Sequence, residues 1–193
     1  ENITKVFKLP AVVAINEFPT DTEEEINLIK EKCNELGVNV ALSQVWSKGG
    51  EGGIDLAKEV VRLCEMKNDF EYAYSLECTI KEKINDIATK IYGADGVTYD
   101  SKAKKELDHI TQMGFGNLPV CMAKTQYSLS DDASKLGRPE GFTINIREVY
   151  VDAGAGFVVA LTGKVLTMPG LPKVPAAEGI DYDEENEKIT GLF

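Results

Sequence analysis

The segment AVVAINEFPTDTEEEINLIKEKCNELGVNVALSQVW, residues 11–46, predicts a strand, a helix and a second strand. Apolar runs at 10–15 and 38–42 are short and contain several valines, as strands buried in a sheet do. Gly37, just before the second run, is typical of a helix end. Because the connection between the two strands is helical, the segment favours a parallel sheet.

The helix between these strands has two candidate starts with the spacing of a capping box, Thr20 with Glu23 and Thr22 with Glu25. A second helix is expected at about 53–66, after a glycine-rich turn. Apolar residues at helical spacing predict the inward face of each helix: Ile26, Ile29, Cys33 and Leu36 on the first, and Ile54, Ala57, Val60, Val61 and Cys64 on the second. Together these segments predict a βαβα unit.

The pattern changes after a break near 68–76. Two helices are predicted by their apolar periodicity: one with Ile80, Ile84, Ile87 and Ile91 that ends at Gly93, and one with Ala103, Leu107 and Ile110 that runs from about Ser101 to Gly114. Strands are predicted at 119–124, 142–151 and 156–161. The expected fold class is α/β, with a parallel-sheet βαβα unit at 1–70 and a smaller α+β region at 71–167.

Residues 168–193 are expected to form an extended C-terminal tail that lies along a surface. Pro169, Pro172 and Pro175 exclude a helix interior or a central strand there. Leu192 and Phe193 are expected to anchor the end of the tail.

Composition restricts the classes of function. A net charge of −11 argues against a nucleic-acid partner, and no apolar run reaches the ~20 residues of a membrane helix. The single histidine, His109, is expected on a helix surface and excludes a polyhistidine metal site. The widely spaced cysteines are expected to be reduced core thiols: Cys33, Cys64, Cys78 and Cys121. With no visible leader, the expected location is cytoplasmic.

Two aromatic residues follow the two strands of the βαβα unit: Phe18 and the only tryptophan, Trp46. Ligands of parallel α/β sheets bind outside the carboxyl ends of the strands, so the two rings are candidates to flank a flat ligand. Asn16 offers an amide to the edge of a heterocycle, and Pro19 and Leu42 are candidates to line the slot. On the residues alone, ordinary core or interface packing of both rings is the alternative.

The glycine-rich stretch KGGEGG, residues 48–53, lacks the G-x-x-x-x-G-K-[ST] spacing of a phosphate-binding loop. Its glycines are therefore expected to allow a tight turn and a close approach to a ligand or a neighbouring segment: Gly49, Gly50, Gly52 and Gly53. No metal-ligand set and no nucleophile–base pair is recognisable, so no catalytic residue is assigned.

Several stretches across the chain resemble the C-terminal third of formate–tetrahydrofolate ligase, also called 10-formyltetrahydrofolate synthetase. They include PAVVAINEFPTDTEEE, ALSQVWSKGGEGGIDLA, KTQYSLSDD, MPGLPKVPAA and the closing ITGLF. The blocks VVAIN-x-FPTDT and MPGLPK-x-P are the most specific. The resemblance implies a part of a larger P-loop-type ligase that uses ATP with Mg, makes formyl phosphate and transfers the formyl group to tetrahydrofolate.

The resemblance also implies roles for particular residues. Phe18 and Trp46 would hold the pterin of the folate, with Pro19 and Leu42 lining the same slot. LGRPEGF, residues 136–142, would border the adenine pocket through Arg138, Gly141 and Phe142, and no residue is assigned to a metal.

We further expect the chain to begin inside a larger protein, because residues 1–8 look like the last turns of a helix. A missing N-terminal domain would carry the phosphate loop, and the whole enzyme would be a homotetramer. The isolated fragment would then be inactive as a ligase. A non-catalytic folate-binding or scaffold fragment is the alternative.

Overall fold

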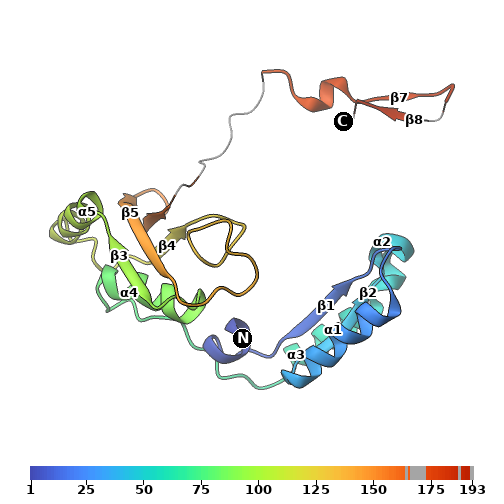
Figure 1. Ribbon diagram of the computed structural model, residues 1–193, viewed down its shortest axis with the longest axis horizontal. Coiled ribbons are helices and arrows are strands. Elements are labelled where there is room, and N and C mark those ends of the chain that lie inside the picture. Colours follow the sequence, from blue (N-terminus) through green and yellow to red (C-terminus); the bar gives the residue numbers. More distant parts are fainter. Residues whose placement is uncertain (164, 166–172, 187, 192–193) are drawn as a thin grey trace.

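The computed structural model describes residues 1–163, 165, 173–186 and 188–191. Two sheet-centred parts lie on either side of a short π-helical turn, η1 (Asn2–Val6), as Figure 1 shows. This mixed α/β architecture with parallel strands agrees with the predicted fold class.

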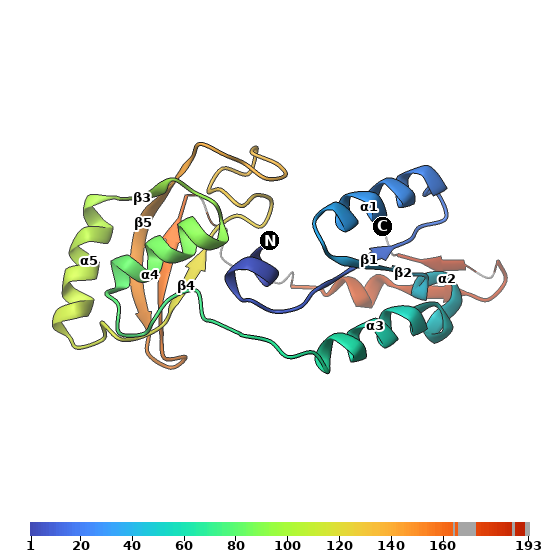
Figure 2. The same cartoon turned by 90° about the horizontal axis from the view of Figure 1, so that it is seen from below.

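The first part is the predicted β–α–β unit followed by a helix. Its strands run parallel and in register, with Val12 opposite Asn39 and Asn16 opposite Ser43. Figure 2 shows helices α1 and α3 on opposite sides of the two strands. The elements are β1 (Val12–Asn16), α1 (Glu23–Glu35), β2 (Asn39–Ser43), α2 (Val45–Lys48), the 3-10 turn η2 (Gly49–Gly53) and α3 (Ile54–Cys64).

Of the two candidate capping boxes, Thr22 with Glu25 is the one that forms at the start of α1. The Glu25 carboxylate accepts a hydrogen bond from the Thr22 backbone N–H at 2.9 Å, and the Thr22 hydroxyl accepts one from the Glu25 N–H. Hydrogen bonds from the backbone and then the side chain of Thr22 hold the pKa of Glu25 below its usual value.

The predicted inward faces of α1 and α3 are largely wrong. On α1 only Ile26 is buried, whereas Leu36 is 68% exposed. On α3 all five predicted inward residues are exposed, and the half-buried residues are Leu56, Glu59 and Leu63. The physical reason is that a sheet of two strands is too narrow to cover the apolar width of either helix.

The second part is a four-stranded sheet in the order β3-β5-β6-β4. β3 and β5 run parallel, β4 and β6 run parallel, and β5 and β6 form an antiparallel pair. The predicted helices and strands are present, and β3 is an additional short strand that the sequence pattern did not indicate. The elements are α4 (Ile80–Asp86), η3 (Ile87–Ile91), β3 (Gly96–Tyr99), α5 (Ser101–Gln112), β4 (Val120–Ala123), β5 (Thr143–Asp152) and β6 (Phe157–Thr162).

The main hydrophobic core lies between α4, α5 and this sheet. It contains Ile80, Ile84, Ala103, Leu107 and Ile110 from the helices and Ile144, Ile146, Val158 and Ala160 from the strands. Lys83 is also fully buried, and its Nζ donates to the carbonyl oxygens of Gly116 at 3.1 Å and Leu118 at 3.2 Å. Desolvation lowers the pKa of Lys83.

The N-terminal segment, residues 1–11, contacts the segment that links the two parts, residues 65–79. Phe7 stacks on Phe70 with ring centroids 6.3 Å apart, and Phe70 meets the edge of Tyr72 at 4.9 Å. Lys8 pairs with Glu71 at 2.5 Å. The predicted break at 68–76 falls in the second of these segments.

The described part of the tail differs from the predicted surface-hugging segment. A 3-10 turn, η4 (Ala176–Gly179), precedes an antiparallel hairpin of β7 (Asp181–Asp183) and β8 (Lys188–Thr190). Every described residue of 173–191 is exposed except the half-exposed Asp183. The hairpin begins after Pro175, the last proline of the sequence, so neither of its strands contains a proline. Pro169, Pro172, Leu192 and Phe193 lie outside the described residues.

The four cysteines are free, as predicted, but they are not core residues. Cys33 and Cys78 are half-buried, and Cys64 and Cys121 are exposed. His109 is exposed on α5, as predicted. No helix in the described part of the chain is long and apolar enough to cross a membrane.

Candidate functional site

The candidate site lies at the carboxyl ends of β1 and β2. The strands end together at the pair Asn16 and Ser43. One further backbone hydrogen bond, from the Glu17 N–H to the Ser43 carbonyl oxygen at 3.0 Å, joins the two strands just beyond that pair. Beyond this bond, the segment that follows β1 carries Phe18 and the segment that follows β2 carries Trp46.

Phe18 stands in a turn that its neighbours close. Its backbone N–H donates to Oδ2 of Asp21 at 2.8 Å, and the Asp21 N–H donates to the Phe18 carbonyl oxygen at 3.0 Å. The Phe18 side chain is 50% exposed, and the following Pro19 is also exposed. The turn therefore holds a large apolar ring in contact with solvent.

Trp46 lies on the one-turn helix α2 and is 71% exposed. The glycine-rich turn that follows supports this helix, because the Gln44 N–H donates to the Gly52 carbonyl oxygen at 3.0 Å. A Cβ on Gly52 would overlap the Gln44 carbonyl oxygen, and Gly49 adopts a φ of 58°. The predicted tight turn and close approach are thus confirmed at these glycines, and the segment approached is the chain's own.

A polar bridge joins the two ring-bearing segments, and sequence reasoning missed it. Nε2 of Gln44 donates to Oε2 of Glu17 at 2.5 Å, across 27 positions of sequence. Nζ of Lys48 donates to Oε1 of the same Gln44 at 2.7 Å. The only signal in the sequence is that a polar residue directly follows each strand.

The remaining predicted residues lie at the same end of the sheet. Asn16 is the exposed last residue of β1, and Leu42 is half-buried on β2 opposite Ile15. Among the described residues, the aromatic ring pairs lie elsewhere and include neither Phe18 nor Trp46. Neither ring is therefore used in aromatic packing within this part of the chain.

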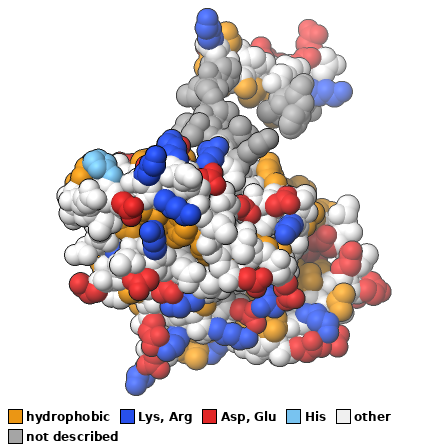
Figure 3. Space-filling view, turned by 60° about the vertical axis from the view of Figure 1, so that its left-hand side comes forward, with side chains coloured by type: hydrophobic (Ala, Val, Ile, Leu, Met, Phe, Trp, Pro, Cys, Tyr) orange, Lys and Arg blue, Asp and Glu red, His pale blue; other side chains and the backbone are white. Residues whose placement is uncertain are grey.

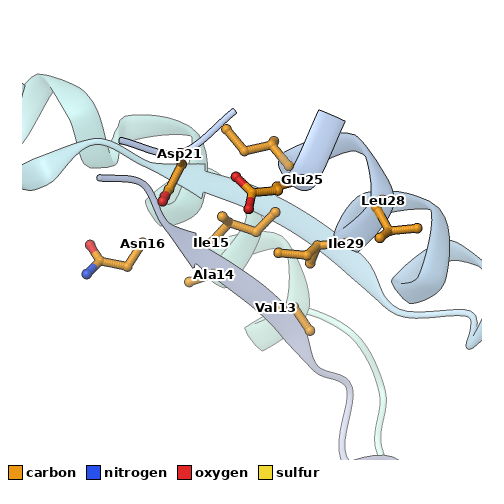
Figure 4. A pocket seen from close by; sticks show the side chains of 9 residues that line it. Val13, Ala14, Ile15, Asn16, Asp21, Glu25, Leu28 and Ile29 are labelled. Carbon is orange, nitrogen blue, oxygen red and sulfur yellow. The ribbon is translucent and has the colours of Figure 1, made fainter. Parts of the chain in front are cut away.

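A groove of about 580 Å³ runs between β1 and α1. Figure 4 shows apolar side chains of both elements along it, with the carboxylates of Asp21 and Glu25 near one end. Of the predicted site residues only Asn16 lines this groove. The groove therefore adjoins the ring-bearing end of the sheet without containing either ring.

The predicted adenine-side residues belong to the second part. Arg138 is 73% exposed, and its Nη2 pairs with Oε2 of Glu1 at 2.9 Å. Gly141 is exposed with a φ of 65°. Phe142 is only 5% exposed and packs in the core, with Nζ of Lys135 5.8 Å from its ring centroid. Its ring is occupied by packing, so only the surface residues of this segment remain candidates.

On the face in Figure 3, Lys and Arg side chains are interspersed with Asp and Glu. Among the described residues, no group of three or more His, Cys, Asp or Glu side chains is arranged to hold a metal ion.

Comparison with known protein families gives one match over the full length of the chain. The family is described as formate–tetrahydrofolate ligase, and it matches residues 1–193. The match covers all three sheets of the described structure and includes the segments that carry Phe18 and Trp46. This chain therefore belongs to the formate–tetrahydrofolate ligase family.

Proposed function

We propose that this chain supplies the tetrahydrofolate-binding pocket of an ATP-dependent ligase that joins formate to tetrahydrofolate. One observation carries the proposal. Phe18 and Trp46, 50% and 71% exposed, follow the carboxyl ends of two adjacent parallel strands in register.

The geometry of a parallel sheet suits a flat ligand at this position. Adjacent strands lie about 4.8 Å apart, and two faces that enclose a flat ring lie roughly 7 Å apart. Side chains just beyond neighbouring strand ends are therefore at a suitable spacing to hold the pterin between Phe18 and Trp46. The exposed amide of Asn16 can hydrogen-bond the edge of the pterin, and Pro19 and Leu42 add apolar lining.

In the proposed reaction, formate takes the γ-phosphoryl group of ATP, which gives formyl phosphate and ADP. The N10 amine of tetrahydrofolate then attacks the formyl carbon. The bond from that carbon to the phosphate oxygen breaks, inorganic phosphate leaves, and N10 loses its proton to give 10-formyltetrahydrofolate. This chain's part is to bind and orient the folate.

We assign the ATP-dependent step to other residues of the complete enzyme. The printed sequence has no phosphate-loop motif, and the described residues hold no group of metal ligands that fits Mg. The proposal places the phosphate loop on a further N-terminal domain, in a cytoplasmic homotetramer. This chain alone would then bind folate without ligating it, and Arg138 and Gly141 would border the nucleotide from the second part.

The direct test is fluorescence of the sole tryptophan, Trp46. Tetrahydrofolate added to the enzyme should quench the Trp46 emission, taken as the difference from a Trp46→Phe variant, with saturation and after correction for light absorbed by the ligand. Phe18→Ala should weaken the saturable quenching while leaving the emission of the free protein nearly unchanged. Emission that does not respond at folate concentrations that saturate turnover would overturn the proposed role of the rings.

A further inference from the structure

We infer that Gln44 is a positioning residue that holds the two ring-bearing segments at a fixed spacing. The inference rests on the proposed function, because it assigns the spacing to the folate pocket. It concerns a residue that contacts neither ring in the proposal and acts through the segments that carry them.

Gln44 is the centre of a three-way connection. Its backbone N–H donates to the Gly52 carbonyl oxygen at 3.0 Å. Its side-chain Nε2 donates to Glu17 at 2.5 Å, and its Oε1 accepts from Lys48 at 2.7 Å. One residue thus joins the segment after β1, helix α2 and the glycine-rich turn.

The Gln44–Glu17 bridge joins the two segments beyond the point where the hydrogen bonds of the sheet end. The last backbone hydrogen bond between the β1 and β2 segments is that from the Glu17 N–H to the Ser43 carbonyl oxygen. Phe18 is the next residue after Glu17, and Trp46 is two residues after Gln44. Beyond the strands, the side-chain bridge is therefore the direct hydrogen bond between the two segments, and the carboxylate makes it a strong one.

Lys48 gives the bridge its direction. An amide presents a donor at one end and an acceptor at the other. Because the Lys48 ammonium can only donate, it takes Oε1 of Gln44, which leaves Nε2 to face the Glu17 carboxylate. A carboxylate at position 44 would instead face the carboxylate of Glu17, so the order of lysine, amide and carboxylate is specific.

The test compares four forms of the complete enzyme: wild type, Gln44→Ala, Gln44→Glu and the swap Gln44→Glu with Glu17→Gln. The swap rebuilds the bridge, because Gln at position 17 can donate to Glu at position 44, which still pairs with Lys48. The matched control is Asn39→Ala, which removes another amide–carboxylate hydrogen bond, that of Asn39 to Glu59 at 2.7 Å, at the other end of β2.

Two readouts are needed. Gln44→Ala and Gln44→Glu should raise the tetrahydrofolate KM by at least about fivefold, the effect of losing one hydrogen bond of ordinary strength, with kcat and the KM values for ATP and formate within about twofold. In the ligand-free enzyme, the Trp46 emission is taken as the difference from the same variant carrying Trp46→Phe, and acrylamide should quench it with a different constant in these variants than in wild type. The swap should restore both readouts, and Asn39→Ala should change neither.

The proposal is overturned if both single variants keep the wild-type folate KM and the wild-type quenching. It is also overturned if a folded swap variant behaves like Gln44→Glu. Should the swap fail to fold, Lys48→Met, which removes the orienting donor from an exposed helix position, is measured in its place with the same expectation as Gln44→Ala.

These results separate the positioning role from the folate role. If Trp46→Ala leaves the folate KM unchanged, the proposed function fails, and the bridge is then decided by the ligand-free quenching alone. A folate KM that rises with Trp46→Ala but not with Gln44→Ala, with unchanged quenching, refutes only the bridge.

Discussion

Replacing Trp46 with alanine is the sharpest perturbation of the proposed pocket. The side chain is 71% exposed on a one-turn helix, so its removal takes little from the core. Folding should therefore survive, and a change in activity can be assigned to the ligand. The expected result is a selective rise in the KM for tetrahydrofolate.

The size of the effect follows from exposure. A tryptophan side chain offers about 150–250 Å², and a flat ligand on one face would cover roughly half of the exposed share, about 80 Å². At about 25 cal/mol per Å² this burial contributes roughly 2 kcal/mol, and stacking adds about 0.5–1.5 kcal/mol. Since each 1.4 kcal/mol is about tenfold, the combined loss should raise the folate KM between about 60-fold and 300-fold.

The assay is steady-state formation of 10-formyltetrahydrofolate by the complete enzyme, with each substrate varied in turn. Trp46→Phe should lie between wild type and Trp46→Ala, because it keeps a smaller ring at the same place. Tyr182→Ala, an exposed aromatic of β7 that is 55% exposed, is the matched control and should leave all three KM values unchanged.

Two outcomes would refute the reasoning. Equal losses for tetrahydrofolate, ATP and formate would indicate a general defect rather than a lost ligand contact, and circular dichroism would confirm it. An unchanged folate KM in a folded Trp46→Ala variant would show that this ring does not contact the folate.

The remaining predictions concern stability and local geometry. Gly52→Ala should raise the folate KM without a change in kcat, because the new Cβ overlaps the Gln44 carbonyl oxygen and displaces the segment before Trp46; an unchanged KM would contradict this. Leu107→Ala, at a site 2% exposed, should lower the free energy of unfolding by about 2–5 kcal/mol. By contrast, Leu36→Ala, at a site 68% exposed, should change it by under about 0.5 kcal/mol; equal losses in urea titrations would contradict this pair. Burial lowers the pKa of Lys83 below its value of 10.5 in the unfolded chain, so the unfolded state binds more protons between those two values. Wild type should therefore gain stability relative to Lys83→Met as the pH rises towards 10.5, and a pH-independent difference would count against the buried ammonium.

Local signals in the sequence were sufficient for much of the fold. The capping pair Thr22 and Glu25, the glycines after helices and the alternation of buried residues in β5 act over a few positions. Such signals depend on hydrogen bonds and sterics within one element, so they can be recognised before any tertiary contact is known. The parallel pairing of β1 and β2 followed from the helical connection between them.

The candidate site was predicted in part by the same means. Phe18 and Trp46 were identified because each follows a strand, and the pairing of Asn16 with Ser43 brings their segments to one end of one sheet. The Gln44–Glu17 bridge was not predicted, because neither residue has a local pattern that names a partner 27 positions away. Phe142 was assigned to the border of the adenine pocket by the family resemblance, and in the structure its ring packs in the core.

Tertiary structure alone decided which apolar faces are covered. Periodicity on α3 correctly marked a stripe of apolar residues, including Ile54 and Val61, yet the structure leaves both exposed. On α5 the same kind of stripe, with Leu107 and Ile110, is buried against a sheet of four strands. The two helices carry equivalent local information, and they differ in what lies opposite them. Burial depends on the width and position of the partner surface, and a single element's sequence does not contain that property.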